Sequence, residues 1–230
     1  MPAILENAND YRYPEFTSNK ELIPKKDAAR INAIPKDKLT QAGISTYANS
    51  LFSKLMAKGD AAEITIIKSV MAKGSSADHF GNAAVLCMLQ GHAQAAIGLS
   101  MKAVQAAPTD ANWQNNMASL LTQYGYAEQA IPVLQKLRNE MDDNSTVLNN
   151  LGQAWFTLGE TDSAMKNLSA AIAINPDNAD ATISHTIIEE TEGKNAGVIE
   201  KYKKAMAQSP DGFTETLLKN SSGQNGINNI

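Results

Sequence analysis

The sequence has few of the residues on which several common classes of protein depend. Its 230 residues contain one cysteine, Cys87, so an intramolecular disulfide and a cysteine-based zinc site are excluded. The 20 basic residues do not outnumber the 24 acidic ones, and the net charge of -4 gives no large positive field for nucleic acid. No apolar run reaches the roughly 18 residues that a membrane span requires.

The N-terminus lacks the basic start and the apolar stretch of a signal peptide. We therefore expect a soluble protein, cytoplasmic by default, with an exported mature form left open as an alternative.

The sequence also lacks an arrangement of residues that predicts catalysis. Enzymes need a nucleophile, a base and a stabilising group brought together, or a metal cluster. His79, His92 and His185 have no partner spacing, and the cluster of carboxylates at residues 189–192 is interpreted as a solvated helix end. We predict no catalytic residues, no metal site and no cofactor, so the chain is not expected to be an enzyme.

Glycines recur at a fixed interval of 34 residues, where one amphipathic segment ends and the next begins. Glycine at such a position adopts the left-handed conformation that ends a helix. A period near 34 is typical of stacked two-helix units. The glycines are Gly91, Gly125, Gly159 and Gly193. They predict four helical hairpins, at residues 77–110, 111–144, 145–178 and 179–212.

Other residues keep the same period. Small side chains early in each second helix allow two helices to approach closely: these are Ala96, Ala130 and Ala164, with Val198 in the fourth unit. Proline, which cannot continue a helix, closes three units at Pro108, Pro176 and Pro210, and Asp142 takes this position once.

The third unit, residues 145–178, resembles a tetratricopeptide repeat. The residues at the family's signature spacings are Leu148, Leu151, Gly152, Trp155, Gly159, Ala164, Leu168, Ala171 and Pro176. Cys87 and Glu189 depart from the pattern, because the family usually has an aromatic residue there. The resemblance implies an all-α fold, an α-solenoid of antiparallel helix hairpins that form a right-handed superhelix. In that family the first helix of each hairpin lines a concave groove.

The flanking segments differ from the repeats. Residues 40–76 are predicted to form a degenerate capping hairpin, because apolar residues recur there at helical spacing and Asp60 with Glu63 is typical of a helix start. Residues 1–39 are interpreted as an extended arm with a short helical stretch near residues 26–34, in which Tyr11, Tyr13 and Phe16 anchor on the helices. Residues 213–220 are predicted to be a short capping helix and residues 221–230 a disordered tail.

Polar side chains recur on the expected groove side of the first helices. An asparagine has both a donor and an acceptor, which complement the carbonyl and the N–H of a peptide unit. The candidate peptide-binding residues are Asn82, Asn115, Asn116, Ser119, Asn149, Asn150, Gln153 and Ser184. An equal alternative is that these amides are generic features of the repeat. Basic residues such as Lys136 fall on second helices and are interpreted as solvated, so the groove is not expected to clamp a carboxylate.

These observations predict a scaffold for protein–protein interaction that binds an extended peptide or a partner protein in the concave groove. The alternative is a structural or assembly role, in which the arm at residues 1–39 docks in its own groove or in that of a neighbouring copy. A homo-oligomer is therefore left open. Nucleic acid and a membrane span are not expected.

Overall fold

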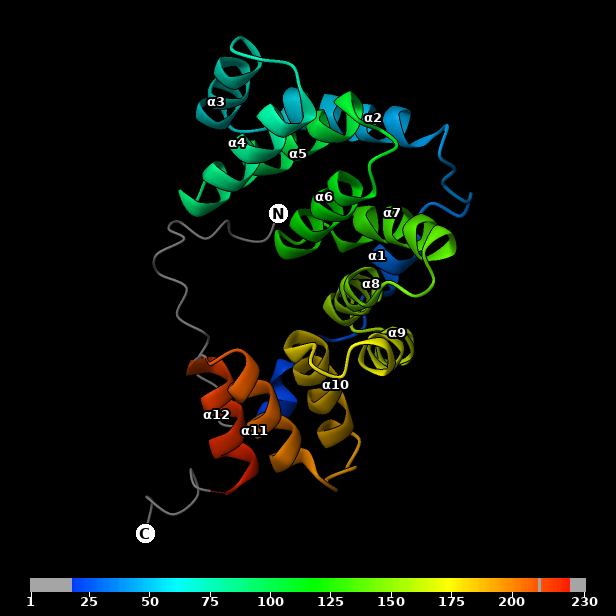
Figure 1. The fold of residues 1–230 in the computed structure, drawn as a ribbon, viewed down its shortest axis with the longest axis vertical. Helices are drawn as coiled ribbons and strands as arrows, with labels where there is room; N and C mark the ends of the chain where they lie inside the picture. The colour runs from blue at the N-terminus through cyan, green and yellow to red at the C-terminus, as the bar shows by residue number, and fades with distance from the viewer. Residues whose placement is uncertain (1–17, 211, 224–230) are drawn as a thin grey trace. The chain divides into compact units, whose positions relative to one another are not determined.

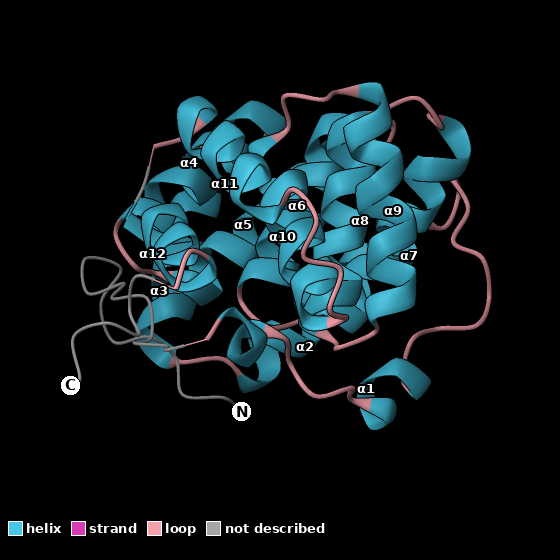
Figure 2. Ribbon diagram, turned by 90° about the horizontal axis from the view of Figure 1, so that it is seen from below, coloured by secondary structure: helices cyan, strands magenta, loops and turns pink. Residues whose placement is uncertain are grey.

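The computed structural model describes residues 18–210 and 212–223. These residues form helices joined by loops, and no strand occurs among them (Figure 1, Figure 2). The predicted all-α class is confirmed. The expected anchors Tyr11, Tyr13 and Phe16 lie outside the described residues, as does the tail from residue 224 onward.

The chain divides into two compact units. In the described part of the chain, the first unit is residues 34–140. The second unit combines residues 18–33 with residues 141–223, apart from residue 211.

The four predicted hairpins are present, two in each unit, and each first helix packs mainly against the second helix that follows it. The hairpins of the first unit are α4 (Ala77–Leu89) with α5 (Ala93–Ala106) and α6 (Ala111–Gln123) with α7 (Ala127–Glu140). Those of the second unit are α8 (Ser145–Thr157) with α9 (Thr161–Ile174) and α10 (Ala179–Thr191) with α11 (Val198–Gln208).

The turn between the two helices of each hairpin contains the predicted glycine. All four glycines have positive φ angles: Gly91 81°, Gly125 84°, Gly159 68° and Gly193 79°. A side chain is disfavoured in this left-handed region, which explains why the period is visible in the sequence.

A second periodic feature starts each hairpin. The residue before each first helix accepts a hydrogen bond on its side chain from a backbone N–H of the first helical turn. Such caps satisfy donors that have no partner within the helix. These residues are Ser76, Asp110, Asn144 and Asn178, again 34 residues apart. The sequence analysis did not identify them.

Each unit has an apolar core of its own. In the first unit, Ile67, Phe80 and Leu99 are buried together with the alanines between α4 and α5 and with Cys87. In the second unit, one cluster centres on Leu148 and Leu168, and another comprises residues of α10, α11 and α12 (Gly212–Ser221).

The predicted capping hairpin at residues 40–76 needs correction. Its two helices are present as α2 (Ile44–Lys58) and α3 (Ala61–Met71), but each packs mainly against α5 and hardly against the other. Two polar contacts hold this segment beside the repeats. Just before α2, Gln41 Nε2 donates to the Pro108 carbonyl at 2.7 Å, and in α2 the Tyr47 hydroxyl donates to the Gln129 carbonyl of α7 at 2.8 Å. The pair therefore does not stack like a fifth repeat.

Residues 18–33, which we call the strap, pack on the second unit although they precede the first unit in sequence. The strap contains the 3-10 helix η2 (Asn19–Leu22) and the short helix α1 (Ala28–Asn32), joined by residues without regular structure. This part of the arm is therefore not simply extended, because two short helical segments interrupt it.

Candidate functional site

The clearest exposed apolar surface of the first unit lies on α4. Val85, Leu86 and Leu89 are 49%, 59% and 65% exposed. Asn82, one turn earlier, is also exposed. Residues three and four apart lie on the same side of a helix, so these four side chains form one continuous stripe. We call this stripe the α4 face.

Helix α6 carries polar candidates at two positions equivalent to the α4 face, Asn116 for Asn82 and Ser119 for Val85, and Asn115 is equivalent to Gly81. Asn116 is exposed, and Asn115 and Ser119 are half-buried. No charged residue occurs in α6, and Asp78 is the only Asp, Glu, Lys or Arg in α4. The first-unit candidates therefore lie on neutral surface, beside apolar side chains that the sequence analysis did not emphasise.

Gly81 lies beside these residues but does not line an open surface. A Cβ atom on Gly81 would lie 2.0 Å from the Trp113 ring, which reaches α4 from α6. Gly81 therefore provides space for the aromatic ring that packs α6 against α4.

The candidates in the second unit mostly bond to one another. Asn149 and Ser184 are only 7% and 8% exposed. Asn149 Nδ2 donates to Asn150 Oδ1 at 3.3 Å, and Gln153 Nε2 donates to Asn149 Oδ1 at 3.3 Å and to the Asp180 carbonyl at 3.2 Å. Ser184 Oγ donates to Gln153 Oε1 at 3.0 Å. Gln153 and Ser184 thus join α8 to α10, and the burial of Asn149 and Ser184 corrects their expected place on an open groove.

A further polar cluster surrounds Asn19 of the strap, which is 2% exposed. The two N–H groups of its Nδ2 are shared among three acceptors: Glu190 Oε2 at 2.8 Å, the Leu217 carbonyl at 3.0 Å and Ser221 Oγ at 2.8 Å. Its Oδ1 accepts from Asn220 Nδ2 at 3.1 Å. This cluster was not predicted from the sequence, because its members lie near opposite ends of the chain.

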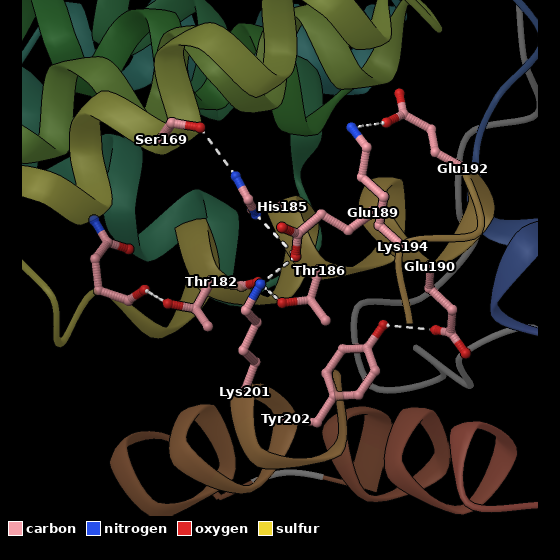
Figure 3. Close-up of polar contacts among 11 residues, drawn as sticks. Ser169, Thr182, His185, Thr186, Glu189, Glu190, Glu192, Lys194, Lys201 and Tyr202 are labelled. Atoms are coloured by element: carbon pink, nitrogen blue, oxygen red, sulfur yellow. Dashed lines mark hydrogen bonds and ion pairs between the residues drawn. The ribbon is translucent and has the colours of Figure 1, made fainter. Parts of the chain in front are cut away.

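Glu189 and Glu190 near the end of α10 bond to residues of α11, so their interpretation as a solvated helix end was wrong (Figure 3). The Tyr202 hydroxyl donates to Glu190 Oε2 at 3.1 Å, and burial raises the pKa of Tyr202 well above its ordinary value. Lys201 of α11 pairs with Glu189. Glu192 does stay near the surface, where it pairs with Lys194.

Ser169, His185 and Glu189 form a chain of polar contacts (Figure 3). His185 Nε2 lies 2.9 Å from Ser169 Oγ, and His185 Nδ1 lies 3.4 Å from Glu189 Oε2. A serine, a histidine and a carboxylate that contact one another in this order also form the catalytic triad of serine hydrolases. However, Ser169 lies inside α9, where the helix uses the backbone N–H groups that would have to bind an oxyanion. The contacts are therefore better explained as packing of α9 on α10.

Lys136 is also not solvated as expected, because it is 4% exposed. Its Nζ donates to Gln114 Oε1 at 3.0 Å and to Glu140 Oε2 at 2.6 Å. The ammonium group therefore links α7 to α6 and does not belong to an outward charged surface.

Comparison with known proteins gives the fold. No protein-family model matches the chain, and no curated protein matches it in sequence. Among solved structures, a thermophilic tetratricopeptide repeat protein of Thermus thermophilus is 17% identical with a TM-score of 0.58, over 65% of this chain and 83% of that chain. A tetratricopeptide repeat protein from Parabacteroides merdae is 20% identical with a TM-score of 0.53, over 80% of this chain and 75% of that chain.

The protein MamA from Desulfovibrio magneticus is 12% identical with a TM-score of 0.52, over 74% of this chain and 97% of that chain. The chain has the tetratricopeptide repeat fold. Helices α4, α6, α8 and α10 are the first helices of its repeats, and the predicted repeat type is confirmed.

The described residues also bear on a membrane span and on a metal site. No helix in that part of the chain is both long and apolar enough to span a bilayer. No group of three or more histidine, cysteine, aspartate or glutamate side chains among those residues is placed to hold a metal ion.

Proposed function

We propose that this tetratricopeptide repeat protein is a scaffold for protein–protein interaction, and that the first-helix surface of its first unit binds an extended, aliphatic segment of a partner. The observation that carries the proposal is the α4 face, where three large aliphatic side chains are exposed beside the amide of Asn82. The proposed site comprises the α4 face with Asn115, Asn116 and Ser119 of α6.

Burial energetics support a binding role for this surface. Covering apolar surface gains roughly 25 cal/mol per Å². Isolated exposed leucines are common, but a contiguous apolar patch with a polar rim is typical of an interaction site. Val85, Leu86 and Leu89 form such a patch, Asn82 lies one turn earlier on the same stripe, and Asn116 is its equivalent in the next repeat.

The charges of α4 and α6 indicate the kind of partner. Neither helix contains a lysine or an arginine, so the surface has no cation with which to bind a terminal carboxylate. Asn82 and Asn116 can donate to a peptide carbonyl and accept from a peptide N–H. We therefore infer that the ligand is a neutral internal segment of a chain with aliphatic side chains facing α4.

A peptide-display selection tests this proposal. Short random peptides are selected on the full chain, and the affinity of the best binders is measured by fluorescence anisotropy. Leu86→Asp should weaken binding at least ten-fold, because it places a charge in the apolar stripe. The matched control is Ile174→Asp, since Ile174 is a 44% exposed aliphatic residue at the end of a second helix. Equal losses in both variants, or none in Leu86→Asp, would refute the site.

A structural role for the N-terminal arm is the second candidate function, and the strap supports it. The strap packs on the second unit through Asn19, Leu22 and Ile23. Light scattering on the full chain distinguishes the two forms of this role: the mass of one chain indicates docking within the same copy, and a multiple of that mass indicates docking on a neighbour.

A further inference from the structure

The strap contacts the second unit at three separate places. The first is Asn19, whose donors and acceptor all have partners on α10 or α12. An aspartate there would lose the donors and place a second carboxylate beside Glu190. The surrounding groups therefore select an amide, because a buried polar group left without a partner costs about 1–3 kcal/mol.

The second place is apolar. Leu22 and Ile23 pack against the cluster that contains Ile183 and Ile187 of α10, together with Phe156 of α8. Ile23 also packs against the cluster around Leu148 and Leu168. Leu22 therefore contacts the apolar cluster of the fourth repeat, and Ile23 contacts both that cluster and the one around Leu148 and Leu168.

The third place is the turn of the third repeat. Asp27 N donates to the Leu158 carbonyl at 2.9 Å, and Lys26 forms an ion pair with Glu160. A Cβ atom on Gly159 would lie 2.5 Å from the Pro24 carbonyl oxygen, so glycine lets the strap backbone pass close to the turn.

The strap thus binds the second unit as a ligand would. It comes from the opposite end of the chain, and the hydrogen bonds of Asn19 with α10 and α12 span sequence separations of 171 to 202 residues. Residues 24–27 have no regular structure, and the side chains of Pro24, Lys25 and Lys26 are exposed. The third repeat, the fourth repeat and α12 follow one another in the chain, whereas the first unit separates the strap from them in sequence.

We propose that the second unit contains a peptide-recognition site that its own strap fills reversibly. The site recognises a segment with the pattern of the strap: an asparagine (Asn19), two adjacent aliphatic residues (Leu22 and Ile23) and a lysine (Lys26). An external segment with this chemistry competes with the strap. The proposal concerns the second unit and does not depend on the α4 face.

Mass action sets the expected competition. The strap is covalently joined to its site through the first unit, so an external peptide competes with a ligand that is always present and binds the wild-type chain weakly. The apparent affinity rises when the site is open more often. Weakening the strap should therefore strengthen the binding of an added peptide.

The probe is a fluorescent synthetic peptide with the sequence of residues 18–33, titrated against full-length chains. We expect the Ile23→Asp chain to bind it at least ten-fold more tightly than the wild-type chain, because the aspartate weakens the tethered strap alone. The Lys20→Ala chain is the matched control and should behave as wild type, because the Lys20 side chain is exposed. The Leu86→Asp chain should also bind this peptide as the wild type does.

A second peptide tests recognition without changing the protein. The same peptide carrying Asn19→Asp should bind the Ile23→Asp chain at least ten-fold more weakly than the unchanged peptide. The Lys26→Glu chain, which changes only an exposed residue of the strap, replaces Ile23→Asp if that chain loses helical circular dichroism. Equal affinity of the wild-type and strap-weakened chains, or of the two peptides, overturns the proposal.

Discussion

At the scale of single residues, side chains at equivalent positions of successive repeats do not share one environment. Gly81, Asn115, Asn149 and Ile183 occupy the same repeat position. Gly81 seats an aromatic ring, Asn149 is buried in a hydrogen-bonded chain, and Ile183 joins the apolar core. The period predicts a residue's place on its helix, but its neighbours decide its role.

Gly81→Ala should destabilise the chain by about 1–3 kcal/mol, because overpacking forces neighbouring side chains to move. The ring of Trp113 would have to leave its place beside α4. Urea unfolding followed by circular dichroism measures this loss. Asn82→Ala, at the exposed neighbouring position, is the control and should unfold as the wild type does. An unchanged midpoint for Gly81→Ala would contradict this packing.

His185 gives a pH dependence of stability. Burial lowers the pKa of His185 below its ordinary value of 6.5; nearby Glu189 opposes this shift, and Lys201 and Lys194 add to it. The unfolded chain therefore binds more protons than the folded chain as the pH falls through 6.5, so the free energy of unfolding decreases there. Unfolding curves above and below this pH should show the decrease in wild type and a smaller one in His185→Gln. An equal decrease in the free energy of unfolding in wild type and His185→Gln would contradict this role of His185.

At the scale of elements, the sequence predicts the arrangement of the helices that belong to the 34-residue repeat. It does not predict the packing of the elements outside the repeat. The hairpins are found because turn glycines and small residues recur every 34 residues. The packing of α2 and α3 on α5, and of the strap on the second unit, leaves no periodic trace. The apolar surface of α4 was left out for a different reason: Val85 was expected on the groove side, but only polar side chains were chosen as candidates.

Lys136 connects two elements through a buried contact. Gln114, which is 1% exposed, donates from Nε2 to the Pro108 carbonyl at 2.7 Å and accepts from Lys136 on Oε1. Lys136→Ala should cost about 1–3 kcal/mol, because it leaves this acceptor buried without a partner. Thermal unfolding tests this, with Lys166→Ala, at an exposed second-helix lysine, as the control. Equal melting temperatures for the two variants would disprove the link.

At the scale of the whole molecule, the two units offer different binding chemistry. The first-helix surface of the first unit is apolar and neutral, with large side chains exposed on α4. In the second unit, amides bond to one another and the strap occupies a polar and apolar site. We therefore expect an external aliphatic segment at the first unit and competition with the strap at the second.

The most direct test of the central claim is photo-cross-linking at residue 86. A photoreactive phenylalanine analogue is incorporated at position 86 in one chain and at position 174 in another, and each is irradiated with a peptide selected on the wild-type chain. The account predicts a covalent adduct, identified by mass spectrometry, at position 86 and none at position 174. An adduct at position 174 with none at position 86 would contradict it.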